Sequence, residues 1–434
     1  MRKATSRNLV AGVLVFLPFA PFVSNHLSHG PSSVVRYGTE VLIDALAVGV
    51  AIRRRRRVVT VLRPLIVPFA VLFGFWLLSA LWNDVSWKVV AIGVRSEFRY
   101  LPIVAIVAIA AAPLRDARVY LWVIVVSAAF QSVLALLYAA NAISLQTTLG
   151  DRNQLGILLM LALILFASGF RELGLGTWAV AGIAMLLLAG VLATASREAA
   201  IGLGIGLAVL GFLELKGWPR LTLVAVAVAA AVVIVIPTVT GSGSGYLDSR
   251  SVAGRWQELF AASFSPDTNF RTRLLVENSK LVAHHNPVLG FGPGMGSAPS
   301  VIKDLSSPVY RSFRAYKLVI QIEPFVYDSN WAILVLETGF VGVALLGALF
   351  VYLAAIGMKA ARRKVWLGSA LIATLFSVVV AGFAAPIFRE PVASFVLWLA
   401  VGLVLNCMRD GSRCLPVIVV GVVGGSEQKQ LSSR

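Results

Sequence analysis

Long apolar runs separated by short polar segments extend along almost the whole chain. Most runs are close to the ~20 residues that an α-helix needs to cross the hydrocarbon core of a bilayer. The pattern predicts about twelve spans. They are placed at residues 8–27, 38–52, 62–82, 98–113, 119–141, 153–170, 177–195, 199–215, 221–238, 329–356, 365–386 and 391–408. The expected fold class is therefore an all-α polytopic membrane protein.

One connection interrupts this regular alternation. Residues 240–327 open with the flexible segment GSGSG, contain the helix-like stretches RWQELFAASF and RTRLLVENSKLVAHH, and include the turn region NPVLGFGPGMG. Connections of this length are usually functional or carry structure of their own. We therefore divide the chain into a transmembrane bundle (1–239), this large loop (240–327), a second group of spans (328–408) and a tail (409–434).

Composition agrees with a membrane protein. The 434 residues are 58% hydrophobic and 13% charged, with a mean hydropathy of +0.85, whereas a soluble domain is about half apolar and a quarter charged. Cys407 and Cys414 match no disulfide framework and no zinc motif. The first apolar run follows a basic start, as in a signal peptide, but no A-x-A-like cleavage site follows it, so we expect a retained first span.

The net charge of +18 raises the alternative of a nucleic-acid partner. The basic residues instead fall in alternate, short connections, which is how Lys and Arg orient a membrane protein by staying in the cytoplasm. These connections contain Arg2, Lys3 and Arg7; RRRRR at 53–57; Arg115 and Arg118; Arg171; Lys216 and Arg220; KAARRK at 359–364; and Arg409 and Arg413. We therefore expect cytoplasmic termini, the large loop on the opposite side and no nucleic-acid partner. The run RRRRR is either an anchor or a site for anionic lipid.

The stretch ATASREAAIGLG (193–204) places Arg197 and Glu198 between two very apolar segments. Arg197 could reach the headgroups from a tight turn and pair with Glu198. Alternatively, it faces a water-filled pocket and binds an anion, since a guanidinium makes bidentate hydrogen bonds to phosphate. Gly202 and Gly206 form a small-xxx-small pair that predicts close helix packing, whereas Gly204 lies on another face.

The glycine-rich run HHNPVLGFGPGMG (284–296) suggests a phosphate cradle, but the dinucleotide fingerprint requires a strand before it and a helix after it. We expect Pro287 to end a helix and the glycines to form a compact turn. His284 and His285 are either turn residues or metal ligands. No His-x-x-x-His partner or Cys accompanies them, and we expect no metal.

A third stretch, YDSNWAILVLETGFVGVALLGALF (327–350), has Asp328, Ser329 and Asn330 at the mouth of a span. Asp328 or Ser329 could cap the helix by accepting its free N–H groups. A carboxylate at that place is also suited to act as a general base. Glu337 is costly in lipid, so it must face protein or water or be protonated.

In this order, these stretches resemble the O-antigen ligase and Wzy-type polymerase family of bacterial envelope polysaccharide synthesis. TLGDRNQLGILL (148–159), which contains Arg152 and Asn153, looks like the beginning of a family span. ATASREAAIGL is similar to the Ser-Arg-Gly motif and gives Arg197 the place of the essential Arg.

Two further motifs carry the resemblance. RTRLLVENSKLVAHHNPVLGFGPG is similar to the Arg-helix-Pro-x-x-Gly-x-Gly signature, in which either Arg271 or Arg273 matches the Arg. DSNWAILVLETGFVG looks like the motif that opens a span and ends in Glu-Thr-Gly-x-x-Gly. Besides the arginines, the positions implied to support the site are Asn153, Pro287, Gly290, Gly292, Ser329 and Gly339.

The resemblance implies a reaction in which an acceptor sugar hydroxyl attacks the anomeric carbon of a glycan linked through pyrophosphate to undecaprenol. Negative charge on the leaving pyrophosphate must be met by preorganised donors. Arg197 is the first candidate, helped by Arg271 or Arg273 and by Arg152; Asp328 is the candidate base. The chain has no Asp-x-Asp pair, so we expect no metal or other cofactor.

The resemblance also implies a bacterial inner-membrane protein with a periplasmic active site. Family ligases have a His where this chain has Asp328, which favours an exopolysaccharide polymerase over a ligase acting on lipid or protein. A transporter of lipid-linked glycan is the alternative from another class, and would show symmetric halves and charges near mid-bilayer. Expected partners are the lipid-linked donor, an acceptor glycan and membrane lipid, with chain-length regulators and export proteins as further candidates.

Overall fold

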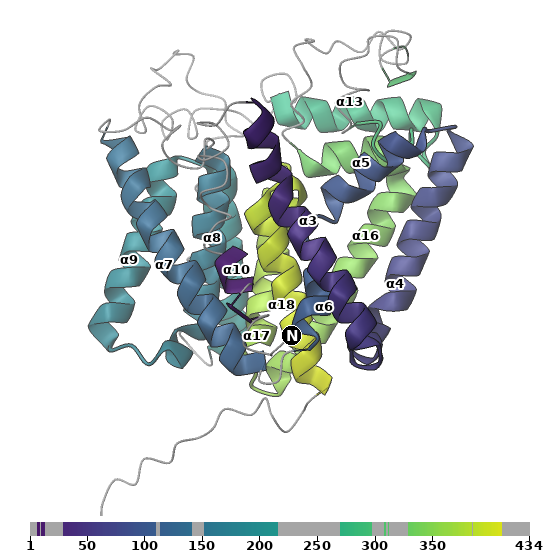
Figure 1. Ribbon diagram of the computed structural model, residues 1–434. Coiled ribbons are helices and arrows are strands. Elements are labelled where there is room, and N and C mark those ends of the chain that lie inside the picture. Colours follow the sequence, from purple (N-terminus) through teal and green to yellow (C-terminus); the bar gives the residue numbers. More distant parts are fainter. Residues whose placement is uncertain are drawn as a thin grey trace, which may run out of the picture.

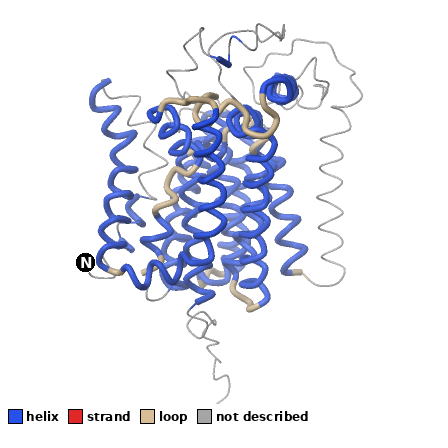
Figure 2. The backbone as a smooth tube through the Cα atoms, turned by 90° about the vertical axis from the view of Figure 1, so that its right-hand side faces the viewer, coloured by secondary structure: helices blue, strands red, loops and turns tan. Residues whose placement is uncertain are grey.

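The computed structural model describes residues 7–8, 10–13, 29–109, 113–140, 152–215, 270–296, 308–309, 311, 329–383 and 385–409. Within these residues the regular structure is helical and contains no strand (Figure 2). The predicted all-α class is confirmed for this part of the chain. The predicted span over 221–238, most of the one over 8–27, and the helix-like stretch RWQELFAASF lie outside the described residues.

The helices are named as in Figure 1. They are α3 (His29–Arg53), α4 (Arg55–Trp82), α5 (Trp87–Glu97), α6 (Ile103–Val107), α7 (Pro113–Ala139), α8 (Arg152–Gly169), α9 (Thr177–Thr194), α10 (Arg197–Glu214), α13 (Phe270–His285), α16 (Asn330–Arg362), α17 (Trp366–Ala381) and α18 (Pro391–Arg409), with two 3-10 turns, η3 (Phe170–Leu173) and η4 (Ile387–Arg389).

Six of the described helices are long and apolar enough to cross a membrane: α4, α7, α8 with η3, α9, α16 and α18. The apolar α17 is shorter. These helices support a multi-pass membrane protein, and the count of twelve spans stays a prediction.

The predicted span over 98–113 is wrong as one continuous helix. α5 ends at Glu97, and apart from Pro113, where α7 begins, only the five residues of α6 are α-helical in the described part of that range. The interruption has a local cause, since Tyr100 adopts a φ of +63°, outside the right-handed helical region. The short segment is nevertheless buried, because Gly402 of α18 leaves space for Val104 and Val107 of α6. Irregular backbone at membrane depth is tolerated where protein surrounds it.

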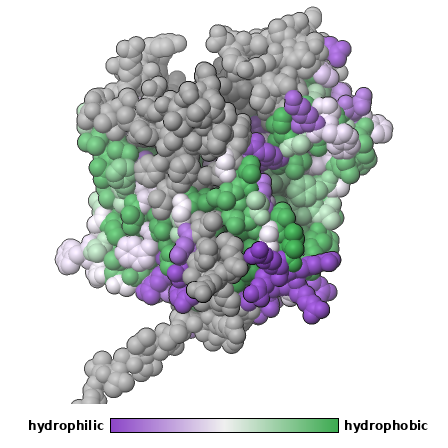
Figure 3. All heavy atoms as spheres, viewed as in Figure 1, coloured by the Kyte–Doolittle hydropathy of each residue, from purple (hydrophilic) through white to green (hydrophobic). Residues whose placement is uncertain are grey.

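The basic connections gather at one end of the bundle. The α3–α4 junction, the first turn of α7, the α8–α9 connection, the α16–α17 connection and the last turn of α18 lie at the lower end in Figure 1, and α13 lies across the upper end. Figure 3 shows hydrophilic residues at the same lower end beneath a hydrophobic band. This is the alternation that the charge pattern predicted, and we call the end with α13 the outer end.

α8 forms the centre of one half of the bundle. Residues 155–166 are all buried, as expected of a helix that is apolar all round and enclosed by others. α10 packs closely on it, because a Cβ on Gly202 would lie 2.5 Å from Met160 Sδ and one on Gly206 would lie 2.6 Å from Ile164 Cδ1. A Cβ on Gly204 would meet nothing within 4 Å. The predicted packing role of Gly202 and Gly206 is thus confirmed.

Candidate functional site

α16 is broken close to its outer end. Gly339 has φ +65° and ψ −174°, so the helix consists of an outer half, residues 330–338, and a longer inner half. The sequence pattern predicted one continuous span here, which is wrong because this left-handed residue cannot belong to a regular helix. Every residue from 329 to 339 is buried. The outer half of α16 is therefore enclosed by protein.

The glycine-rich turn after α13 satisfies the backbone at this break. Phe291 N donates to Leu336 O at 2.9 Å and Gly292 N donates to Glu337 O at 2.8 Å. In return, Phe340 N donates to Pro287 O at 2.9 Å. Carbonyls at a helix C-terminus lack partners within the helix, and the turn supplies them. The turn thus fixes where the outer half of α16 ends.

The same hydrogen bonds show that the N–H groups of this turn serve its own structure and its contact with α16. The N–H groups of Gly290, Phe291, Gly292 and Met295 donate to backbone carbonyls, and Gly296 N donates to Glu337 Oε1 at 3.1 Å. Residues 289–296 are buried. A phosphate cradle needs free N–H groups, so these five do not form one. The backbones of Pro287, Gly290 and Gly292 take part in these hydrogen bonds, and their role in a site stays a prediction.

His285 closes the end of α13 against this turn. Its ring stacks on Phe291 with centroids 4.0 Å apart and an interplanar angle of 9°, and Nε2 lies 3.4 Å from Asn83 Oδ1. Burial lowers the pKa of His285. α13 ends at His285, as predicted from Pro287. Among the described residues, no three His, Cys, Asp or Glu side chains gather as metal ligands would; the metal-free site stays a prediction.

The second motif forms a tight turn between α9 and α10. Ala195 has a left-handed φ of +49°, and Ser196 caps α10 by accepting from Ala199 N at 3.4 Å. Ser196 Oγ also donates to the buried Glu198 carboxylate at 3.0 Å. Arg197 is thus the first residue of α10, at the outer end. Its helix start is fixed by a left-handed turn and a side-chain cap.

The beginning of α8 lies against this turn. A Cβ on Gly156 would lie 2.7 Å from Ser196 Cβ and 3.0 Å from Ala199 Cβ. Arg152 and Asn153 open α8 one turn earlier. The two motifs at 148–159 and 193–204 are therefore brought together, as a shared site requires.

The end of α17 joins the Arg197 turn to the mouth of α16. A Cβ on Gly202 would lie 3.4 Å from Ala381 Cβ. Just after Ala381, Gly382 O accepts a hydrogen bond from Asn330 N at 2.9 Å. Arg197 lies five residues before Gly202, or about 7.5 Å along the helix axis. Ser329 is the N-cap of α16 and accepts from Ala332 N at 3.3 Å. The helix starts that carry Arg197 and Ser329 hence share one neighbourhood.

Residues 182–347 match the family model Wzy_C, described as O-antigen ligase. This match supports the O-antigen ligase family for the region. It extends from α9 into α16 and includes the Arg197 turn, α13 and the glycine-rich turn. No curated protein matches the chain.

Some predictions for this O-antigen ligase domain and its surroundings fall outside the described residues. Asp328 is one of these positions, and the side chains of Arg152, Arg197, Arg271 and Arg273 are likewise not described. Their roles stay predictions.

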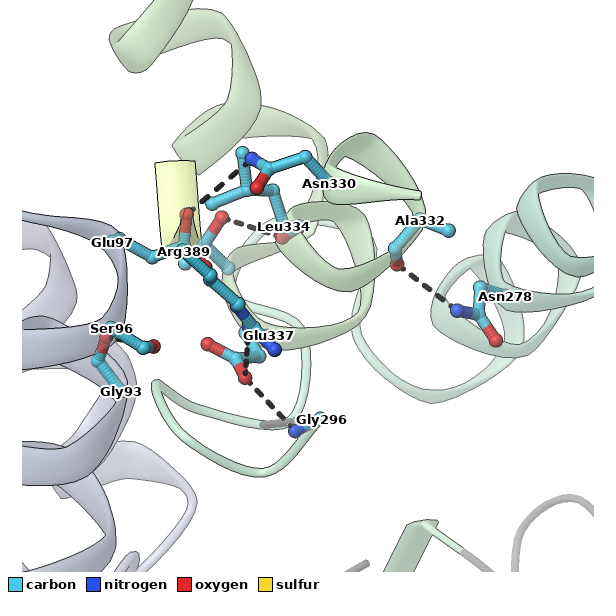
Figure 4. A network of polar contacts seen from close by, with 11 residues as sticks. Gly93, Ser96, Glu97, Asn278, Gly296, Asn330, Ala332, Leu334, Glu337 and Arg389 are labelled. Atoms are coloured by element: carbon cyan, nitrogen blue, oxygen red, sulfur yellow. Dashed lines mark hydrogen bonds and ion pairs between the residues drawn. The ribbon is translucent and has the colours of Figure 1, made fainter. Parts of the chain in front are cut away.

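The sequence indicates arginines at outer helix ends, Arg95, Arg99 and Arg389 among them, but the sequence analysis did not predict the charge network that they form beside the matched region (Figure 4). Arg389 forms an ion pair with Glu97 at 2.9 Å and lies 3.8 Å from Glu337. Further along, Arg99 Nε pairs with Glu40 Oε1 at 2.8 Å, and Arg95 contacts the same carboxylate. The requirement that Glu337 face protein or water is met. The available signal was that Glu40 and Glu337 lie in apolar segments of the sequence and need cationic partners.

Proposed function

We propose that this protein is a glycosyltransferase that joins undecaprenyl-pyrophosphate-linked oligosaccharide repeats into an exopolysaccharide or O-antigen. The observation that carries the proposal is the O-antigen ligase domain at residues 182–347, with Arg197 at a helix start inside it. The family match supports glycan processing of the ligase or polymerase type. The lipid-pyrophosphate donor and the polymerase activity are our inference.

The proposed reaction needs a base for the acceptor hydroxyl and cationic groups for the leaving pyrophosphate. Asp328 takes the proton of an acceptor hydroxyl, whose oxygen attacks the anomeric carbon of the donor. The bond between that carbon and the pyrophosphate oxygen breaks, and undecaprenyl pyrophosphate leaves. Arg197, with Arg152 and Arg271 or Arg273, stabilises the charge that develops on the leaving group. The fixed starts of α8 and α10 support this assignment, since preorganised donors need no rearrangement during the reaction.

We place the reaction at the outer end of the bundle, on the periplasmic face of a bacterial inner membrane with cytoplasmic termini. Support comes from the basic connections that gather at the opposite end, because such residues are retained in the cytoplasm. The proposed donor lipid would then meet Arg197 near the membrane surface. The partners are that lipid, an acceptor glycan and membrane lipid.

A ligase that transfers a finished glycan to lipid or protein is the second candidate, and the family description favours it. Asp328 favours the polymerase, since the resemblance implies a His there in ligases. Purified protein in lipid nanodiscs, incubated with lipid-linked oligosaccharide, tests both. Longer glycans on the carrier support the polymerase, and glycan on a separate acceptor supports the ligase. Movement of donor across liposomes without new glycosidic bonds would instead indicate a transporter.

The same assay tests the expected independence from metals. Activity in excess chelator should equal activity without it. Loss of activity in chelator, restored by a divalent cation, would contradict the metal-free mechanism.

A further inference from the structure

Glu97 and Arg389 come from elements that are far apart in the sequence and meet beside the outer half of α16. Glu97 is the last residue of α5, and Arg389 ends the turn η4 before α18. Arg389 donates from Nε at 3.0 Å and from Nη2 at 2.9 Å to Glu97 Oε1. The side chain of Glu97 is 2% exposed and that of Arg389 is 19% exposed. Most of this pair is thus removed from water.

The pair reaches α16 at two points on one face. Glu97 Oε2 accepts from Asn330 Nδ2 at 3.4 Å, and Arg389 Nη2 lies 3.8 Å from Glu337 Oε1. Residues i and i+7 lie on the same side of a helix. The ionic pair therefore contacts both ends of the outer half of α16, as Figure 4 shows.

The glycine-rich turn is attached to the same face. Glu337 Oε1 also accepts from Gly296 N at 3.1 Å. A Cβ on Gly93 of α5 would lie 2.7 Å from Gly294 Cα, so α5 packs directly on the turn. Any shift of the Glu97 carboxylate would thus be transmitted to Asn330, to Glu337 and to the turn.

We propose that Glu97 and Arg389 are positioning residues of the transferase, because they hold the outer half of α16, with its N-cap Ser329, in the orientation that the transfer step needs. This inference rests on the proposed function. Asn330 is the link, because it follows Ser329 and Asp328 directly and is held by Glu97 through its side chain and by Gly382 through its backbone.

The charge balance separates this network from the anion-binding arginines. Arg95, Arg99 and Arg389 face Glu40, Glu97 and Glu337, and Arg99 Nη1 donates to Arg389 O at 3.0 Å, which connects the two groups. In these contacts each cationic side chain thus faces a carboxylate, and Asp44 lies within electrostatic reach of Arg95 as well. The network supplies no excess positive charge for a pyrophosphate, which leaves that role to Arg197 and its neighbours.

Glu97→Asp tests the proposal. It keeps the charge but shortens the side chain by one methylene, so the carboxylate must withdraw from Asn330 or pull Arg389 with it. We expect the variant to unfold in detergent at nearly the wild-type temperature and to keep the wild-type KM for lipid-linked donor. We expect kcat to fall about a hundredfold, as displacement of a reacting group by about 1 Å can cause.

Glu277→Asp is the matched control, since Glu277 forms an ion pair with the exposed Lys280 on α13 at the same end; we expect wild-type kcat. Arg389→Lys keeps the charge but loses the planar guanidinium that donates twice to Glu97, so it should also lower kcat at constant KM. This variant tests the proposal if Glu97→Asp does not fold. Wild-type kcat in either folded variant would overturn the positioning role while leaving the transferase intact. A wild-type protein that makes no new glycosidic bond would overturn the proposed function and this inference with it.

Discussion

Gly290 and Gly339 lie backbone to backbone where the glycine-rich turn meets the break in α16. A Cβ on Gly290 would lie 2.6 Å from Gly339 N, and one on Gly339 would lie 2.8 Å from Gly290 N. Both residues have a φ of +65°. This contact joins the glycine-rich turn of the large loop to a membrane helix, and it determines where the outer half of α16 ends.

Gly290→Ala and Gly339→Ala should each destabilise the protein. The left-handed backbone costs a residue with a Cβ about 1–2 kcal/mol, and overpacking adds about 1–3 kcal/mol. Thermal unfolding in detergent, followed by circular dichroism, measures the loss. Gly347→Ala is the control in the same helix, because a Cβ there would meet nothing within 4 Å. Equal unfolding temperatures in all three variants would show that the contact is not tight.

The packing of α10 predicts a contrast within one helix. Gly206→Val should destabilise by about 1–3 kcal/mol through overpacking, because Ser377 and Ile164 occupy the space that its side chain needs. Gly204→Val, two residues away, should stay near wild type, since that side of α10 is open. The measurement is again thermal unfolding. A reversed order of the two variants would contradict this packing of α10 against α8 and α17.

Much of this arrangement could be predicted from local signals. Apolar runs gave the helical class, Pro287 marked the end of α13, and the spacing of Gly202 and Gly206 indicated a packed face. The interruption at Tyr100 and the break at Gly339 could not be predicted in this way, because the apolar composition of a straight helix and of a broken helix is the same. The break depends on partners from a distant turn, which hydropathy does not report.

The pH dependence of stability should have a component from His285. Burial lowers its pKa from the ordinary value of 6.5, so the fold favours the neutral ring. The unfolded chain then binds the proton first, and this part of the stability is complete above about pH 6.5 and is lost as the pH falls towards the lower folded pKa. His285→Phe keeps a ring to stack on Phe291 and cannot titrate.

Unfolding temperatures measured from about pH 8 to about pH 5, the range in which a histidine titrates, check this prediction. The wild type should lose more stability on acidification than His285→Phe, because all carboxyl groups are common to both proteins. Curves of equal slope would show that His285 titrates alike in the folded and unfolded chain.

The motifs of the candidate site could be predicted from the sequence, but the ion pairs that surround them could not. The segments around Arg152, Arg197 and Ser329 gather through Gly156 and the end of α17, as one site requires. The ion pair between Glu97 and Arg389 was not predicted, because a contact between a helix end and a distant turn leaves no periodic pattern in the sequence. The sequence shows only that a buried acid needs a partner, and the fold decides which one.

Substitutions of Asp328 and Ser329 should have different effects, because Asp328 is the proposed base and Ser329 is the cap of α16. Ser329→Ala removes the cap of α16 and should cost about 0.5–2 kcal/mol of stability. Asp328→Asn keeps a capping side chain and removes the proposed base, so the protein should unfold like wild type and make little or no polymer. Unfolding temperature and product formation are measured for both variants. Normal polymer formation by Asp328→Asn would leave Asp328 without a catalytic role.

Arg197→Lys examines the proposed pyrophosphate contact. Lysine keeps the charge and loses the planar fork that binds phosphate through two hydrogen bonds. Polymer formation should therefore fall by about tenfold or more, towards the roughly hundredfold to thousandfold loss found when one preorganised donor is removed altogether. The folded state should persist, because the cap of α10 belongs to Ser196 and not to residue 197. Arg363→Lys is the control, as Arg363 is exposed in the connection after α16 at the opposite end. Wild-type product from Arg197→Lys, with unchanged KM for the donor, would reduce Arg197 to an anchor at the membrane surface.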